Sequence, residues 1–540
     1  MLDRLVDKLL GLPRAEGPKP VVTRDLATPM PDGVTLLADR YAPEGTTSAP
    51  VVLIRTPYGR AGLLSKLFGD TFARHGLQTV VQSTRGSFGS GGEFRPFHLE
   101  REDGVATAEW LREQPWCDGN VAMAGASYLG HTQWAVGPYL DPPLAAMCLG
   151  VTASEFVSTF YPGGVLAADN MVSWSAMIGR QEERFAALPN PLQKRKTRRA
   201  MAHLPLSGAD VAAIGKPVQF LQDITTHFVP DDDYWVMSDH SAEVAKLDVP
   251  VTMVTGWYDL FIRGQLRDFR ILAEAGKQPR ITIGPWAHGE LASMGPMIRD
   301  QLGFVRAHLL GDRAQLQRSP VRLFLQGANS WLDFESWPPP STPTTSHLRP
   351  VGGLGEAAER ALPTTFTYDP ADPTPAVGGP LLTGETKQRD NQEVEARPDV
   401  LVFTGEPLPA DLDVIGEVAA TVHARTELGH ADVYVRLCDV APDGVSRNVT
   451  DGILRLRPGF PTADEDGVVT AEVDLDPTAY RFRRGHRLRV QVAGGGFPRF
   501  ARNHGTGEPV TSAVDGKPNR FEVFHDAARP SRITLPVFSG

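Results

Sequence analysis

A serine among small residues is the first group in the sequence whose type and setting could support nucleophilic chemistry. Residues 121–130 read Val-Ala-Met-Ala-Gly-Ala-Ser-Tyr-Leu-Gly, an apolar run that leads into Ser127. A sharp turn between a strand and a helix exposes a serine hydroxyl in this way, and it needs small neighbours so that chain and substrate can approach. The usual glycine two residues after the serine is replaced by Leu129, and Gly130 follows one step later. The segment predicts Ser127 as a nucleophile, with an ordinary strand-to-helix turn as the alternative.

Two later residues match the partners that such a serine requires. A serine hydroxyl is a weak nucleophile until a histidine accepts its proton, and a carboxylate must hold that histidine in one tautomer. Asp259 follows the apolar run 251–255 and Gly256, and His288 follows the next β-rich run, 280–283. The order serine, acid, histidine, each just after a strand, is that of the α/β-hydrolase fold. We therefore predict a catalytic triad of Ser127, Asp259 and His288.

An oxyanion would form on the substrate and needs hydrogen-bond donors. The backbone N–H of Tyr128 follows the nucleophile and is the expected first donor. In the loop after an early strand, Tyr58 could donate its phenol hydroxyl. The residues alone favour a tyrosine packed under that loop.

The pattern of strand-like and helix-like segments along the chain predicts three parts that would position these residues. Residues 1–150 and 246–345 alternate β-rich runs with helical stretches, the rhythm of a parallel α/β sheet. Residues 151–245 are rich in Ala, Leu, Arg and Met and predict a helical cap inserted into the sheet. A proline-rich connection around 338–350 leads to about eight short β-patterned runs within 346–540, which predict a β-sandwich of the jelly-roll kind.

Composition sets limits on the partners and the compartment of the protein. The chain of 540 residues carries 54 basic and 64 acidic side chains, a formal charge of −10 that argues against a nucleic-acid-binding surface. Its three cysteines lie far apart in the sequence and predict neither a disulfide framework nor a metal site. Residues 1–10 lack the pattern of a secretory signal and predict a short packing helix. We expect a cytoplasmic monomer or homodimer without a membrane partner, a metal or an organic cofactor.

The motifs together resemble the cocaine-esterase-like hydrolases, a group related to X-prolyl dipeptidyl aminopeptidases and α-amino-acid ester hydrolases. The resemblance spans nearly the whole chain and rests on these segments: Thr56-Pro57-Tyr58, Ser83-Thr84-Arg85-Gly86, Trp116-Cys117-Asp118-Gly119-Asn120, residues 125–130, Gly256-Trp257-Tyr258-Asp259, Gly284-Pro285-Trp286-Ala287-His288, Tyr368-Asp369-Pro370 and residues 485–490. The family's serine turn carries tyrosine and a displaced glycine, so Leu129 becomes a match.

The resemblance implies further roles for individual residues. It places the hydroxyl of Tyr58 in the oxyanion hole, which reverses the interpretation from spacing alone. It implies an α/β-hydrolase core, a helical cap after the sixth strand and a C-terminal jelly roll that walls the active site. The family's substrate pocket is aromatic, and Phe261, Trp174 and Phe160 look like its counterparts here. Core packing is the alternative for these aromatic side chains.

The expected substrate is a small carboxylic ester with a hydrophobic, aromatic acyl group, cleaved through an acyl-enzyme on Ser127. The alternative is an α-amino-acid ester hydrolase or X-prolyl dipeptidyl aminopeptidase, which must hold an α-ammonium group with carboxylates. Asp231-Asp232-Asp233 is the acidic candidate for that role, and an exposed turn is its other interpretation. A non-enzymatic alternative is a carbohydrate- or polymer-binding protein acting through the C-terminal β domain.

Overall fold

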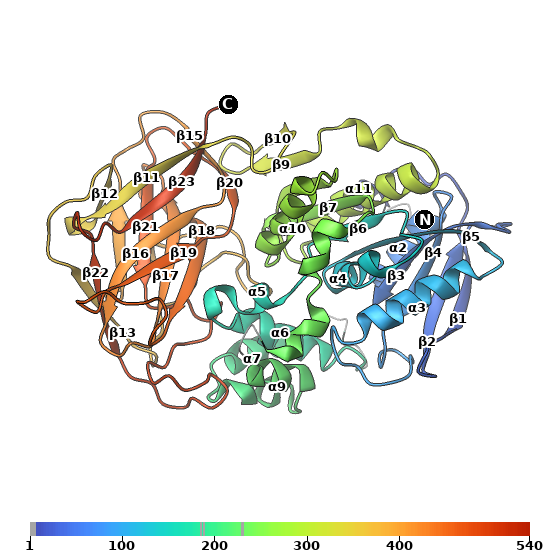
Figure 1. The fold of residues 1–540 in the computed structure, drawn as a ribbon, viewed down its shortest axis with the longest axis horizontal. Helices are drawn as coiled ribbons and strands as arrows, with labels where there is room; N and C mark the ends of the chain where they lie inside the picture. The colour runs from blue at the N-terminus through green and yellow to red at the C-terminus, as the bar shows by residue number, and fades with distance from the viewer. Residues whose placement is uncertain (1–6, 184–185, 187–189, 228–231) are drawn as a thin grey trace.

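A parallel sheet flanked by helices, a group of helices and a β-rich C-terminal part make up the computed structural model, which describes residues 7–183, 186, 190–227 and 232–540 (Figure 1). Of the predicted N-terminal helix, residues 7–10 are described: residues 7–9 are helical and residue 10 lies in a turn. None of the helices in these residues has the length and apolar character needed to cross a membrane.

The first sheet has ten strands in the order β1-β2-β4-β3-β5-β6-β7-β8-β9-β10. Neighbours from β4 through β9 run parallel, and β1, β2 and β10 pair in antiparallel fashion at the two edges. The strands are β1 (Val21–Pro29), β2 (Thr35–Ala42), β3 (Ala49–Thr56), β4 (Gln78–Ser83), β5 (Cys117–Ala126), β6 (Met147–Gly150), β7 (Val251–Tyr258), β8 (Arg280–Ala287), β9 (Val321–Leu325) and β10 (Ser330–Phe334).

Helices cover both faces of this sheet, which explains why its central strands are apolar almost throughout. Alternate residues of β3 face opposite sides, so Val52 and Ile54 join one apolar cluster while Val51 and Leu53 join the other. The first cluster includes side chains of α2 (Leu63–Ala73), α4 (Tyr128–Trp134) and α11 (Leu291–Leu309). The second includes side chains of α3 (Glu100–Arg112) and α10 (Ile262–Glu274). We call this sheet with its helices the hydrolase part.

The segment between β6 and β7 is helical, and we call it the cap. Its helices are α5 (Val157–Phe160), α6 (Ala168–Ile178), α7 (Pro191–Ala200), α8 (Ala209–Ile214) and α9 (Gln219–Thr226). Apolar residues of α6 and α9 join the same cluster as one face of the sheet, so the cap and the hydrolase part share a core. Figure 1 shows the cap below the sheet, between the hydrolase part and the C-terminal strands.

The C-terminal β domain contains thirteen strands in one hydrogen-bonded network that folds around a main apolar cluster, and a smaller cluster joins some of its side chains to Val165 of the cap. They are β11 (Thr342–Arg349), β12 (Gly353–Gly355), β13 (Thr364–Tyr368), β14 (Val400–Thr404), β15 (Leu412–Gly416), β16 (Ala419–Thr426), β17 (Ala431–Val440), β18 (Ser446–Leu456), β19 (Val469–Asp474), β20 (Thr478–Phe482), β21 (Arg487–Ala493), β22 (Asn519–Phe524) and β23 (Arg532–Phe538). A short helix, α12 (Gln392–Glu395), precedes β14. Side chains from facing layers meet in this cluster, as in a β-sandwich.

The proline-rich stretch around 338–350, expected to be a connection, contains a strand. β11 pairs with β23, and Pro343 lies directly opposite Pro536. Proline lacks an N–H, so it is tolerated in a strand only where no ladder bond needs that donor. Two prolines facing each other meet this condition on both strands.

Candidate active site

The turn between β5 and α4 holds Ser127 in a left-handed backbone conformation, with φ 57° and ψ −121°. The neighbouring glycines are required by close contacts. A Cβ atom on Gly125 would lie 2.5 Å from the Cβ of Leu129, and one on Gly130 would lie 2.4 Å from Cγ2 of Thr152. Glycine is therefore needed at 130, where α4 approaches the residues that follow β6, while Leu129 packs into the core.

The ends of β5, β7 and β8 bring Ser127, Asp259 and His288 together. Nε2 of His288 lies 3.1 Å from Oγ of Ser127, and Nδ1 lies 2.7 Å from Oδ2 of Asp259. A carboxylate only accepts hydrogen bonds, so Nδ1 carries the hydrogen and Nε2 is left to accept the proton of Ser127. Asp259 is fully buried, and its other oxygen accepts a hydrogen bond of 2.8 Å from the backbone N–H of Phe261. The geometry is that of a proton relay from serine to histidine.

Two donors converge beside Ser127. Tyr128 is the first residue of α4, so its backbone N–H has no acceptor within the helix. Tyr58 lies in the loop after β3, and its hydroxyl accepts a hydrogen bond of 3.0 Å from Nε1 of Trp174 in the cap. Because that oxygen accepts from the indole, its own hydrogen is available to a substrate. Burial raises the pKa of Tyr58 to about 12, which keeps the phenol protonated.

A pocket beside these groups is lined mainly by aromatic rings. Its empty volume is about 360 Å³, including the part open to solvent. The residues predicted from the family's pocket, Phe160, Trp174 and Phe261, line it. Its remaining walls include Tyr58, Phe97, Tyr128, Phe156, Asn170, Met171, Leu260 and Leu382. None of the lining residues within the described part of the chain carries a carboxylate.

Six of these walls were not predicted from the sequence, among them Phe97, Phe156 and Leu382. Phe97 precedes α3, and its ring stacks on Tyr128 at 4.8 Å and on Trp174 at 5.5 Å. Phe156 packs against Phe261 at 4.5 Å. No motif or spacing marks these residues, because tertiary packing alone brings them to the pocket.

Leu382 reaches the pocket from a loop of the β domain, residues 379–387. Gly379 and Lys387 exchange two backbone hydrogen bonds, which close the base of this loop. At its tip, the backbone N–H groups of Leu382 and Thr383 donate to the carboxylate of Asp169 in α6. At its base, Nζ of Lys387 lies 2.6 Å from Oε1 of Glu290, two residues after His288. We call residues 379–387 the β-domain loop.

The acidic triplet 231–233 does not line the pocket in the part that the structure describes. Asp232 accepts from the backbone N–H of Tyr234 at 2.9 Å and lies 3.0 Å from Nδ1 of His227. Asp233 is exposed, and Asp231 lies outside the described residues. Asp232 therefore caps the start of a short 3₁₀ helix of the cap, Asp233–Ser238. Elsewhere in the described chain, no group of three His, Cys, Asp or Glu side chains is arranged to hold a metal ion.

A serine, histidine and aspartate at the carboxyl ends of parallel strands define the class of α/β-hydrolases with a serine nucleophile. Comparisons with known proteins specify the family. The family model described as X-Pro dipeptidyl-peptidase (S15 family) matches residues 32–290, and that described as X-Pro dipeptidyl-peptidase C-terminal non-catalytic domain matches residues 315–534. Cocaine esterase of Rhodococcus sp. (strain MB1 Bresler) is 30% identical, over 96% of this chain and 98% of the relative. The chain belongs to the cocaine-esterase-like serine hydrolases, and it is a serine carboxylic-ester hydrolase.

Two solved structures share the fold over nearly their whole length. An α-amino-acid ester hydrolase aligns with a TM-score of 0.81 at 22% identity, and an aminopeptidase from a marine sediment archaeon, Thaumarchaeota archaeon, with a TM-score of 0.81 at 24% identity. In each case 98% of both chains is covered. The likeness confirms the expected fold class: an α/β-hydrolase core followed by a C-terminal β domain.

Proposed function

We propose that this enzyme hydrolyses neutral carboxylic esters with a hydrophobic, aromatic acyl group, through an acyl-enzyme on Ser127. The observation that carries the proposal is the pocket beside Ser127, which is walled by aromatic rings and, among the residues that the structure describes, has no carboxylate in its lining. A substrate α-ammonium group would lose its hydration there without gaining an anionic partner. An aromatic acyl group would instead bury apolar surface against Phe97, Phe160 and Trp174.

The proposed reaction has two steps. Oγ of Ser127 attacks the ester carbonyl while Nε2 of His288 accepts its proton, and Asp259 stabilises the resulting imidazolium. The oxyanion of the tetrahedral intermediate accepts hydrogen bonds from the Tyr128 amide and the Tyr58 hydroxyl. His288 then protonates the leaving alcohol. Water, activated by the same histidine, attacks the acyl-enzyme and releases the acid.

The proposal is tested with two matched methyl esters, those of phenylacetate and of its α-amino analogue phenylglycine. We expect the wild type to prefer the neutral ester by at least tenfold in kcat/KM. Ser127→Ala should lower hydrolysis of either ester by several orders of magnitude, because both steps lose their nucleophile. Mass spectrometry of the wild type, quenched during turnover of a 4-nitrophenyl ester, should show the acyl group on Ser127.

Each arm of the test can contradict one part of the proposal. Preference for the phenylglycine ester would assign the chain to the α-amino-acid ester hydrolases. Activity of Ser127→Ala within a few-fold of wild type would contradict the nucleophile.

A further inference from the structure

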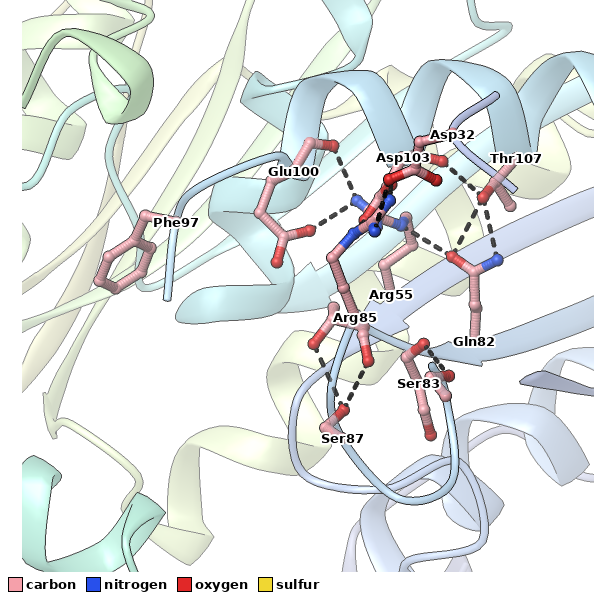
Figure 2. A network of polar contacts seen from close by, with 12 residues as sticks. Asp32, Arg55, Gln82, Ser83, Arg85, Ser87, Phe97, Glu100, Asp103 and Thr107 are labelled. Atoms are coloured by element: carbon pink, nitrogen blue, oxygen red, sulfur yellow. Dashed lines mark hydrogen bonds and ion pairs between the residues drawn. The ribbon is translucent and has the colours of Figure 1, made fainter. Parts of the chain in front are cut away.

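Figure 2 shows a network of charged and polar side chains around Arg55 and Glu100, at the end of β3 and the start of α3. Its centre is Arg55, near the end of β3 and fully buried. Nε of Arg55 donates to Gln82 at 2.9 Å, and Nη1 donates to the side chain of Glu100 at 2.6 Å and to its backbone carbonyl at 2.8 Å. Because Tyr58 follows Arg55 by three residues, this network anchors the strand end that carries one donor.

The second carboxylate oxygen of Glu100 connects the network to the other donor. The hydroxyl of Tyr128 donates to Oε1 of Glu100 at 2.6 Å and accepts from the backbone N–H of Phe97 at 3.0 Å. The Tyr128 phenol is therefore fixed from both sides, and its backbone N–H is the proposed oxyanion donor. A single carboxylate thus joins the strand before Tyr58, the residue after Ser127 and the aromatic wall at Phe97.

Stability alone does not explain a charge at this place. Glu100 is the first residue of α3 and is 4% exposed. Burial raises the pKa of its carboxyl, against the opposing effect of the Arg55 cation. Buried ion pairs gain little over well-packed apolar side chains, since removing two charges from water is costly. An apolar residue could not accept hydrogen bonds. The Glu100 carboxylate supplies one acceptor oxygen to the Arg55 guanidinium and a second to the Tyr128 phenol.

We infer that Glu100 is a positioning residue for ester hydrolysis, which holds the Tyr128 amide and the Tyr58 loop in the relative placement that the oxyanion requires. The inference rests on the proposed function, because the two oxyanion donors belong to that proposal. Oxyanion stabilisation depends on donors that are already in place before the reaction. A small displacement of either donor lowers the rate without preventing substrate binding.

Asp103 provides a matched control one turn along the same helix. Its side chain is also buried and forms two hydrogen bonds with Arg85, of 2.9 and 2.6 Å, and its Oδ2 lies 4.0 Å from Arg55 (Figure 2). Within the described chain, the Asp103 side chain forms no hydrogen bond with Tyr128. Asp103→Asn therefore removes a buried carboxylate from the network but keeps the bond between Glu100 and Tyr128.

The test compares Glu100→Gln, Tyr128→Phe and Asp103→Asn with the wild type. A glutamine at 100 has one amide oxygen in place of the two carboxylate oxygens that accept separately from the phenol and from Arg55, and its second group is a donor. Tyr128→Phe removes only the hydroxyl and keeps the backbone amide. Steady-state kinetics use methyl phenylacetate. A trifluoromethyl ketone analogue, benzyl trifluoromethyl ketone, reports on the oxyanion donors directly, because its adduct with serine carries the oxyanion.

We expect Glu100→Gln to lower kcat at least tenfold with KM within about threefold of wild type, and to weaken binding of the ketone by a similar factor. Tyr128→Phe should show the same loss in kcat and in ketone binding. Asp103→Asn should keep kcat within threefold. A kcat of Glu100→Gln as close to wild type as that of Asp103→Asn would overturn the inference. If Glu100→Gln does not fold, Tyr128→Phe decides, and unchanged ketone binding in that variant has the same meaning.

Failure of the proposed function is distinguishable from failure of this inference. Loss of activity in Ser127→Ala tests the proposed function and does not depend on Glu100. A wild type that needs Ser127, together with a Glu100→Gln variant of unchanged kcat, contradicts the positioning role alone.

Discussion

Ser127 and Tyr58 occupy conformations that their neighbours impose. The serine has a positive φ, a strained state that persists where the surrounding structure determines it. Gly125 and Gly130 leave the space for it, since a Cβ at either would meet Leu129 or Thr152. The Tyr58 hydroxyl is oriented by the Trp174 indole, at 3.0 Å. The chemistry is thus prepared by individual contacts before a substrate arrives.

Tyr58→Phe tests the second donor at the level of one atom. We expect kcat to fall by about a hundredfold or more, as for the loss of other oxyanion donors, with little change in KM. The hydroxyl is proposed to contact only the oxygen on which charge develops. Trp174→Phe is a companion variant, because it keeps an aromatic ring in the pocket wall, although a smaller one, and removes the indole N–H that orients the phenol. If Tyr58→Phe retains its turnover number, the residue serves packing alone.

Helix α4 begins directly after the nucleophile, and it also packs against a wall of the pocket. His131, one turn after Ser127, is fully buried and lies 4.5 Å from the ring of Phe156, a wall of the pocket. His240, in the last part of the cap, lies 5.3 Å from His131, and its Nδ1 lies 3.1 Å from the hydroxyl of Tyr139. Burial lowers the pKa of His131 to about 3 and that of His240 to about 4.

These histidines should make the fold sensitive to acid. In the unfolded chain a histidine gains a proton below its ordinary pKa of about 6.5, whereas the folded protein keeps both neutral. Their contribution to stability is complete above pH 6.5 and is lost as the pH falls toward 4 and 3. At pH 5, each histidine should lower the free energy of unfolding by about 2 kcal/mol relative to its value above pH 6.5, because the loss is about 1.4 kcal/mol per pH unit.

Urea unfolding at pH 7.5 and at pH 5 measures this effect. The wild type should lose about 2 kcal/mol more free energy of unfolding between these pH values than His131→Gln does. Because each protein is compared with itself at the two pH values, the result is independent of how much the substitution destabilises the protein at neutral pH. Equal losses in the two proteins would show that His131 does not titrate as proposed.

At the scale of the whole molecule, the pocket is built by three distant parts of the chain. The hydrolase part supplies Ser127 and His288, the cap supplies Trp174, and the β domain supplies Leu382. Asp169 holds the tip of the β-domain loop: its carboxylate accepts from the N–H of Leu382 at 2.8 Å, and from the N–H and hydroxyl of Thr383 at 3.2 and 2.7 Å.

Asp169→Asn tests this connection. An asparagine directs an amide N–H₂ group at donors that need an acceptor, so we expect stability to fall by about 1–3 kcal/mol. With Leu382 released, KM for the aromatic ester should rise about tenfold while kcat changes less. Thr383→Val removes only the hydroxyl bond and should have a smaller effect on KM. An unchanged KM in Asp169→Asn would mean that the loop does not define the pocket.

The sequence was most informative where chemistry follows a strand. Apolar runs ending at Ser127, Asp259 and His288 predicted both the fold class and the residues that the structure brings together. Tyr58 illustrates the limit of that approach, because spacing alone favoured packing and only the resemblance indicated a role near the nucleophile. Glu100 carries no signal: it is an acidic residue at the start of a helix, a common arrangement.

Prediction was weaker in the β domain. About eight β-patterned runs were expected in a region that has thirteen strands. Strands such as β12, with only Gly353–Gly355, and β11, with three threonines and a proline in its first four residues, lack an alternating apolar pattern. Their pairing is decided by partners far away in the sequence, as between β11 and β23. For the same reason, Leu382 could not be assigned to the pocket.

The β-domain loop also has a consequence for the order in which the enzyme becomes competent during its synthesis. The serine, aspartate and histidine have all been translated by residue 288, but Leu382 and Lys387 come about a hundred residues later. Lys387 then binds Glu290 beside the histidine, and the strands that support the loop extend to residue 538. A nascent chain with all three triad residues therefore has an unfinished pocket. We therefore expect full activity to require translation of the β domain as well as of the triad residues.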